Sequence, residues 1–150
     1  MRALIQRVTR ASVTVEGQVT GSIGTGMLVL CGFGADETSE DLNWTARKIC
    51  GLRIFDDENG VMNLPLAEVG GDILAVSQFT LMASTKKGNR PSYVHAAPPE
   101  ISEPLFEAFK RELSAVLGHE VQSGIFGADM KVDLLNDGPV TIWIDSKNKL

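Results

Sequence analysis

The sequence predicts a mixed α/β fold: a single compact domain, residues 1–150, with twisted, barrel-like mixed β-sheets packed against two main helices. A length of 150 residues with 43% hydrophobic residues suits one domain with a real core. Six to eight short segments have the period or the apolar run of strands, whereas only two have a helical period. Strands and helices do not alternate regularly, which favours a mixed arrangement.

The first third of the chain predicts consecutive strands. Residues 11–16 alternate apolar and polar side chains, which is typical of a strand with one solvated face. Gly17-Gln18 predicts a turn into a second strand at residues 19–23. Residues 27–33 are apolar apart from Gly32, which predicts a central strand buried on both faces.

Two segments predict helices. The first is capped by Thr38 or Ser39 and ends at Gly51, with Leu42, Ala46, Ile49 and Cys50 on one face. The second is capped by Ser102 and ends at Gly118. Its apolar stripe is interpreted as core packing and consists of Leu105, Phe106, Phe109, Leu113, Val116 and Leu117.

The middle of the chain predicts a hairpin, a buried strand and a long loop. Residues 53–55 and 61–64 flank an acidic turn at 56–60, which lacks the ligand spacing of a calcium loop. Residues 72–76 form a buried strand that continues into Ser77-Gln78-Phe79-Thr80-Leu81. Residues 85–99 are polar, basic and proline-rich, and irregular loops of this length are usually functional or mobile.

Near the C-terminus, residues 130–135 and 140–144 both alternate and predict a strand pair joined by residues 136–139. A plain hairpin needs only Asn-Asp-Gly, whereas Gly138 is followed by Pro139, which removes one backbone donor and fixes one φ angle. The corner is either a simple turn or a rigid backbone grip for a small ligand, and periodicity leaves both open.

Composition excludes several classes of protein. A net charge of −5 argues against a general nucleic-acid coat, although Lys86, Lys87 and Arg90 form a local basic patch. No apolar run approaches a membrane span of about 20 residues, and the N-terminus has no signal-peptide pattern, so we expect a cytoplasmic protein with no membrane association. Cys31 and Cys50 lie in apolar settings and are interpreted as core residues.

No standard catalytic motif is present. His95 and His119, the two histidines, have no metal-ligand spacing; His119 suits a surface charge partner, and nothing ties His95 to a nucleophile. The remaining candidates are Ser77, Gln78 and Thr80 at the end of a buried strand. They either line a polar pocket with the backbone N–H groups near Phe79 or simply face water.

Several segments carry a specific resemblance when they are taken in order: Met1–Val8, Leu52–Phe55, Met62–Leu64, Val69–Gly71, Ser77–Leu81, Lys87–Tyr93, Gly124–Met130 and Asn136–Thr141. With these segments the chain resembles the D-aminoacyl-tRNA deacylase family along its full length. The resemblance implies a homodimer that hydrolyses the ester joining a D-amino acid to the 3′ end of tRNA, and also glycine mischarged on alanine tRNA. It implies no metal and no organic cofactor.

The resemblance also implies which residues form the site. Ser77, Gln78, Phe79 and Thr80 match the catalytic motif, and Gly138-Pro139 matches a cis Gly-Pro motif that selects chirality inside the partner's pocket. Lys86, Lys87 and Arg90 are candidates for RNA phosphate contacts. We expect backbone N–H groups near Phe79 to hold an oxyanion, and a positioned water, with a tRNA hydroxyl assisting, to attack in preference to Thr80.

Two other interpretations compete with this one. The first is a non-catalytic module that binds the tRNA end. The second is a peptidase or general esterase, against which the absence of a Ser/His/acid arrangement weighs.

Overall fold

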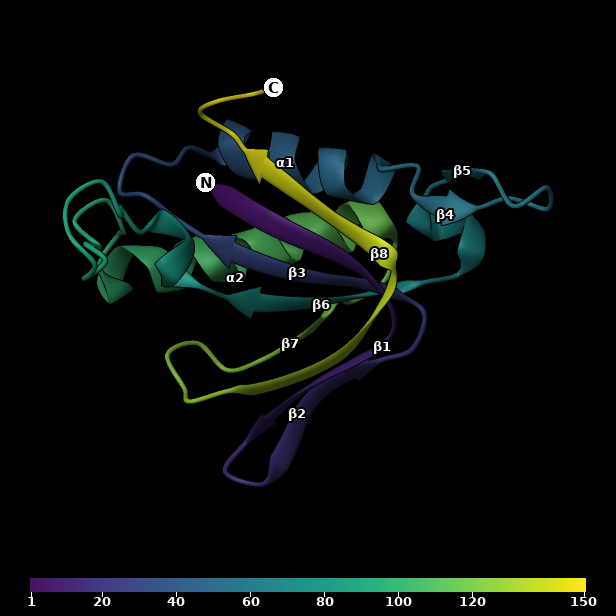
Figure 1. The fold of residues 1–150 in the computed structure, drawn as a ribbon, viewed down its shortest axis with the longest axis horizontal. Helices are drawn as coiled ribbons and strands as arrows, with labels where there is room; N and C mark the ends of the chain where they lie inside the picture. Colours follow the sequence, from purple (N-terminus) through teal and green to yellow (C-terminus); the bar gives the residue numbers. More distant parts are fainter.

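The computed structural model describes residues 1–150 and contains one six-stranded mixed sheet (Figure 1). Its strands are β1 (Arg2–Val15), β2 (Gln18–Ile23), β3 (Gly26–Gly32), β6 (Asp72–Ser77), β7 (Gln122–Ser123) and β8 (Lys131–Asp145). The strand order is β2-β1-β3-β6-β7, with β8 paired to β1. Strands β3, β6 and β7 run parallel to one another, and the β1 pairings are antiparallel.

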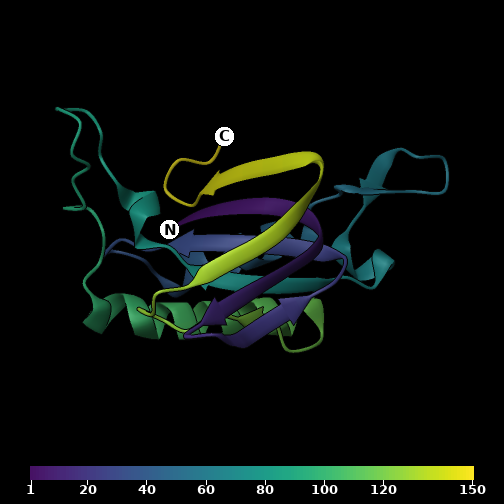
Figure 2. The same ribbon diagram turned by 60° about the horizontal axis from the view of Figure 1, so that its bottom comes forward.

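The sheet curls because β1 is long and changes partner. Residues 2–8 pair with β3, whereas residues 11–15 pair with β2. A Cβ atom at Gly21 of β2 would lie 2.6 Å from the carbonyl oxygen of Ser123 in β7, so the two outer strands approach closely. The result is the nearly closed, barrel-like sheet that the sequence predicts, and Figure 2 shows its curvature.

Both helices, α1 (Ser39–Gly51) and α2 (Pro99–Leu117), pack on one face of this sheet and against each other. The larger core cluster joins Leu42 and Ile49 of α1 and Phe106 and Phe109 of α2 to Val29 of β3. A second cluster fills the inside of the curved sheet and includes Leu28 and Leu74. Strand β3 is therefore buried on both faces, as its continuous apolar run predicts.

The helix ends agree with the sequence at three positions and differ at one. Thr38 caps α1 with a capping box to Asp41, and Gly118 ends α2 at a φ of 91°. Helix α1 extends through Gly51, the glycine that was predicted to end it. The prediction that Ser102 caps α2 was wrong, because the helix begins at Pro99 and Ser102 lies in its first turn, where its Oγ donates to Pro98 O at 3.1 Å. Proline suits a first turn because its missing N–H has no partner there.

Short elements connect these layers. The predicted hairpin is present as β4 (Phe55–Asp56) and β5 (Met62–Leu64), and Asp57 accepts hydrogen bonds from the backbone of Asn59 and Val61 in its turn. Two 3₁₀ helices, η1 (Leu66–Val69) and η2 (Phe79–Met82), were not predicted from the sequence.

The predicted strand pair around Gly138 and Pro139 was wrong in its topology. Residues 131–145 are one strand, and both halves pair with β1. Val8 faces Asn136, and Gln6 faces Thr141, so the chain does not turn back but loops out of β8 and rejoins it. We call residues 137–140 the Gly-Pro arch. Alternation on both flanks could not separate one interrupted strand from two.

The two ends of the chain meet beside α1. The α-ammonium of Met1 is buried and contacts Glu37 Oε1 at 2.5 Å and Ser146 Oγ at 2.6 Å. Lys147 pairs with Asp41 of α1 at 2.7 Å. No helix among residues 1–150 is long and apolar enough to cross a membrane.

Candidate active site

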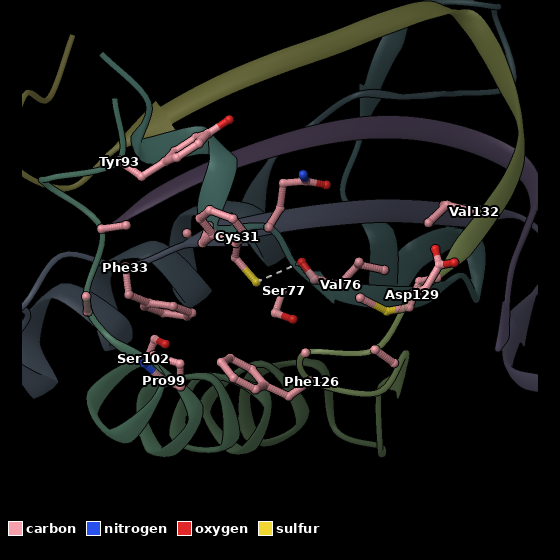
Figure 3. A pocket seen from close by; sticks show the side chains of 18 residues that line it. Cys31, Phe33, Val76, Ser77, Tyr93, Pro99, Ser102, Phe126, Asp129 and Val132 are labelled. Carbon is pink, nitrogen blue, oxygen red and sulfur yellow. Dashed lines mark hydrogen bonds between the residues drawn. The ribbon is translucent and has the colours of Figure 1, made fainter. Parts of the chain in front are cut away.

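A cavity of about 580 Å³ opens where β3 and β6 end (Figure 3). Its wall combines the end of β3, the end of β6 with the start of η2, the loop before α2, the first turn of α2, and the segment leading into β8. Most of the lining is hydrophobic and includes Phe33, Val76 and Phe126. The cavity therefore offers an apolar enclosure with polar groups at one strand end, as small-molecule sites commonly do.

The predicted motif lies at this strand end. Ser77, Gln78 and Phe79 line the cavity. Thr80 does not line it, but the Nε2 of Gln78 donates a hydrogen bond to Thr80 Oγ1. The structure thus brings three of the four motif residues to the cavity wall and links the fourth to Gln78 by a hydrogen bond, while their catalytic roles stay predictions.

Gly32 allows the motif to sit where it does. A Cβ atom at this position would lie 2.8 Å from Gln78 O and 3.2 Å from the side chain of Leu81. Gln78 N also donates to Cys31 O at 2.7 Å, which continues the parallel pairing one residue past β6. The end of β3 therefore positions the start of η2 through direct backbone contact.

The amides of the first two residues of η2 are not used by the turns and loops around them. Leu81 N donates to Gln78 O and Ala83 N to Thr80 O, whereas the amides of Phe79 and Thr80 donate in none of the backbone hydrogen bonds found in turns and loops. The first N–H groups of a helix have no acceptor within the helix. These two donors stand beside Ser77 and Gln78 at the strand end.

Neither the cysteine nor the histidines supply an activated group. Cys31 lines the cavity, but burial raises the pKa of its thiol far above the ordinary range, and its Sγ lies 3.4 Å from Val76 O. His119 contacts Asp72 at 2.8 Å on the surface, as predicted for a charge partner. His95 is exposed and does not line the cavity. No cluster of three or more potential metal ligands occurs in residues 1–150.

Some lining residues were not named as site residues from the sequence. Tyr93, Phe126 and Met130 line the cavity, and Tyr93 packs edge-on against Phe79 with ring centroids 5.0 Å apart. Asp129 lies at the rim, largely exposed and 3.2 Å from Lys131. The sequence did indicate these residues indirectly, because the segments Lys87–Tyr93 and Gly124–Met130 are among those that carry the family resemblance.

The basic residues lie on the loop that leads to Tyr93. A bridge between Ser84 and Ser92 closes this loop at its base. Lys86, Lys87 and Arg90 are exposed beyond the bridge and do not line the cavity. The loop thus places positive charge outside the cavity, on the same side as Tyr93.

The Gly-Pro arch lies away from this cavity. The Gly138–Pro139 peptide is cis, and the φ of Gly138, 143°, is one that L side chains rarely adopt. The guanidinium of Arg7 donates to Asp137 O at 2.9 Å and to Ile54 O at 2.6 Å. In Figures 1 and 2 the basic loop lies at one end of the molecule, and the bend of β8 lies well apart from it, toward the β4–β5 hairpin. No residue of the arch lines the cavity of its own chain.

Comparison with known proteins identifies the family. The family model described as D-Tyr-tRNA(Tyr) deacylase matches residues 4–145. This chain belongs to that family. A relative named D-aminoacyl-tRNA deacylase from Bacteroides thetaiotaomicron is 62% identical over 99% of both chains, and another of that name from Chromobacterium violaceum is 61% identical over 99% of both.

Solved structures extend the family likeness to the fold. A structure described as c-Myc DNA Unwinding Element Binding Protein superposes with a TM-score of 0.90 at 41% identity, covering 97% of this chain and 98% of that one. A probable eukaryotic D-amino acid tRNA deacylase has a TM-score of 0.83 at 19% identity, covering 95% of this chain and 97% of that one. The second likeness concerns the fold alone. The family resemblance and the predicted fold class are therefore confirmed.

Proposed function

We propose that this protein hydrolyses the ester bond of D-aminoacyl-tRNA, releasing the free D-amino acid and tRNA, and rejects L-aminoacyl-tRNA. The observation that carries this proposal is full-length membership of the deacylase family, with the Ser77–Phe79 segment lining the cavity. The test is the deacylation of D-Tyr-tRNA and L-Tyr-tRNA by the purified protein. Rapid release of D-tyrosine alone is expected, and equal rates on both substrates, or none, would contradict the proposal.

Catalysis in this proposal depends on positioning rather than on an activated side chain. The N–H groups of Phe79 and Thr80 stabilise the oxyanion that forms when water attacks the ester carbonyl, a contribution of about 3 kcal/mol for each donor. A water molecule, assisted by a hydroxyl of the terminal tRNA ribose, is the nucleophile. Thr80 Oγ1 accepts a hydrogen bond from Gln78 and has no histidine or carboxylate among its hydrogen-bond partners to serve as a base.

Replacement of Thr80 separates the two possible nucleophiles. With water as the nucleophile, Thr80→Ala retains measurable turnover, because the backbone donors remain. The measurement is single-turnover deacylation of D-Tyr-tRNA, with denaturing mass spectrometry of the wild-type protein during the reaction. Loss of all turnover together with a covalent acyl-enzyme in the wild type would assign the attack to Thr80.

We propose further that the protein acts as a homodimer in which the arch of each chain enters the partner's cavity. The separation of the arch from its own cavity supports this arrangement. In the partner's cavity the carbonyls of Gly138 and Pro139 hold the α-amino group of the substrate, and the arch occupies the space that an L side chain would need. A steric exclusion suits the task, because apolar contacts alone discriminate by only about 1–3 kcal/mol.

Two experiments test this arrangement. Pro139→Ala should raise the hydrolysis of L-aminoacyl-tRNA, and unchanged rejection in a folded variant would contradict the chiral role.

Mixing a Pro139 variant of low activity with Gln78→Ala should restore activity above that of either parent, because one site of the hybrid dimer combines a native Gln78 with a native arch from the partner. No recovery in a sample shown to contain hybrid dimers would contradict a shared site.

The same site leads to finer proposals about substrates and location. Glycine has no side chain to be excluded, so glycine mischarged on alanine tRNA is a second expected substrate. Lys86, Lys87 and Arg90 meet phosphates near the 3′ end of the tRNA, and the protein works in the cytoplasm, where tRNA is charged. No metal or organic cofactor is required.

A second candidate function follows from the 41% identical structure, which is described as a DNA-unwinding-element binding protein. On this alternative the chain binds a nucleic-acid end without hydrolysis. The net charge of −5 disfavours broad duplex binding. Binding of a non-hydrolysable D-aminoacyl-adenosine without any turnover of D-Tyr-tRNA would favour the alternative.

A further inference from the structure

The Gly-Pro arch leaves a gap in the pairing of β1 with β8. Gln6 faces Thr141 and Val8 faces Asn136, so Arg7 between them has no partner residue in β8. Arg7 is buried, and a buried backbone carbonyl needs a donor. An interrupted strand pair therefore requires a substitute for the missing ladder hydrogen bond at this position.

The side chain of Asn136 supplies that substitute. Its Nδ2 donates to Arg7 O at 3.0 Å and to Val140 O at 3.1 Å. An amide group has two N–H donors, and both are used here. Asn136 precedes the arch and Val140 is its last residue, so a single side chain ties the two ends of the arch to each other and to β1.

Arg7 completes a closed set of contacts. Its carbonyl accepts from Asn136, while its guanidinium donates to Asp137 O at 2.9 Å. Arg7 is thus bonded both to Asn136 and to the next residue, Asp137, and these two hydrogen bonds fix the base of the arch to β1. Gly138 and Pro139 are themselves exposed, so the contacts that orient them are concentrated at this base.

We propose that Asn136 is a positioning residue for chiral selection, acting through the orientation of the Gly138 and Pro139 carbonyls. This inference rests on the proposed function, in which the arch excludes L-aminoacyl groups. Loss of the two hydrogen bonds from Asn136 lets the arch move relative to β1 and change its orientation. Because selection by steric exclusion depends on the placement of the obstacle, such displacement reduces rejection of the L substrate.

The experiment compares two variants of Asn136 with one control. Asn136→Asp keeps the shape, removes both donors and turns a carboxylate oxygen toward two carbonyl oxygens, whereas Asn136→Ala removes the donors without adding charge. The control is Asn148→Asp, which makes the same charge change at an exposed residue whose side chain makes no hydrogen bond to the arch. Folding is monitored by circular dichroism and thermal unfolding.

The measured quantity is the ratio of kcat/KM for D-Tyr-tRNA to that for L-Tyr-tRNA. We expect this ratio to fall about tenfold in a folded Asn136 variant and to stay unchanged in Asn148→Asp. A merely structural role would reduce both rates in proportion to the folded fraction and leave the ratio constant. If Asn136→Asp fails to fold, the D/L ratio of Asn136→Ala is compared with that of the wild type instead.

The outcomes separate this inference from the function on which it rests. A wild-type protein that hydrolyses neither substrate overturns the proposed function. A wild-type protein that is active and selective, with a folded Asn136→Ala variant whose D/L ratio is unchanged within twofold, overturns the positioning role of Asn136 alone.

Discussion

At the scale of single residues, Gly32 shows how a missing side chain builds the site. The end of β3 meets the start of η2 so closely that a Cβ atom would lie 2.8 Å from Gln78 O. Well-packed protein interiors relieve such an overlap only by moving backbone, at a cost of about 1–3 kcal/mol. The residues that would move are Gln78 and its neighbours at the cavity wall.

Gly32→Ala should therefore lower deacylation of D-Tyr-tRNA by up to about a hundredfold, since a displacement near 1 Å has that effect on positioned groups. The measurement is kcat/KM together with urea unfolding. Gly51→Ala is the matched control, because its Cβ meets no atom within 4 Å at the end of α1. That variant should be neutral or slightly more stable, and equal effects of the two substitutions would contradict the role of Gly32.

At the scale of elements, the start of α1 depends on charge as well as on capping. Thr38 and Asp41 form a capping box, and Lys147 from the C-terminal segment contacts the same carboxylate. Desolvation opposes the ionisation of Asp41, but hydrogen bonds from Lys147 and Thr38 outweigh it and hold the pKa of this carboxyl well below its usual range. The helix start thus carries a pH-dependent contribution to stability.

The sign of that contribution follows from the lowered pKa. Unfolded Asp has a pKa of about 3.9, so ionised Asp41 stabilises the folded state above this pH, and the benefit is lost as the pH falls toward the folded-state value. Asp41→Asn should be about 1 kcal/mol less stable than wild type at pH 7. Urea unfolding across pH 7 to 3 should show this difference shrinking below about pH 4, and a constant difference would contradict the assignment.

At the scale of the whole molecule, the two chain ends meet at a buried charge. Glu37 Oε1 contacts the α-ammonium of Met1 and also accepts from Gly34 N at 3.0 Å. Removing one partner of a buried ion pair leaves the other charge without compensation. Because Gly34 follows Phe33 of the cavity wall, this pair also supports the site.

Glu37→Gln should lower the free energy of unfolding by about 3 kcal/mol, measured by urea unfolding at pH 7. Glu40→Gln in the first turn of α1 is the control, with an expected loss below about 1 kcal/mol because Glu40 is exposed. Similar losses of unfolding free energy in the two variants would show that the buried Met1–Glu37 ion pair stabilises the protein no more than an exposed carboxylate does.

Charge is also distributed unevenly over the molecule. The net charge is −5, yet Lys86, Lys87 and Arg90 gather on one loop outside the cavity. With three basic side chains near single-stranded phosphates, the slope of log(kcat/KM) against log salt should be no steeper than about −2. Replacing all three residues by alanine should flatten the slope, and a slope that stays the same would exclude this loop as the phosphate contact.

Local patterns in the sequence were enough to predict both helices apart from the start of α2, the buried strands β3 and β6, the hairpin at β4 and β5, and the family. Periodicity, caps and glycines are local signals, so the roles of Thr38 and Gly118 at helix ends could be predicted from their neighbours in the sequence alone. Ordered motifs indicated the site segments because Ser77–Leu81 and Asn136–Thr141 occur together.

The spatial relation between those segments became known from the three-dimensional structure. The alternation around Gly138 was compatible with a hairpin, and pairing of both flanks with β1 decided for an arch within one strand. The closeness of Gly32 to Gln78, the burial of the Met1 ammonium and the separation of the arch from its own cavity are long-range facts. Local patterns do not encode which distant residue supplies a contact, because that depends on how the whole sheet curls.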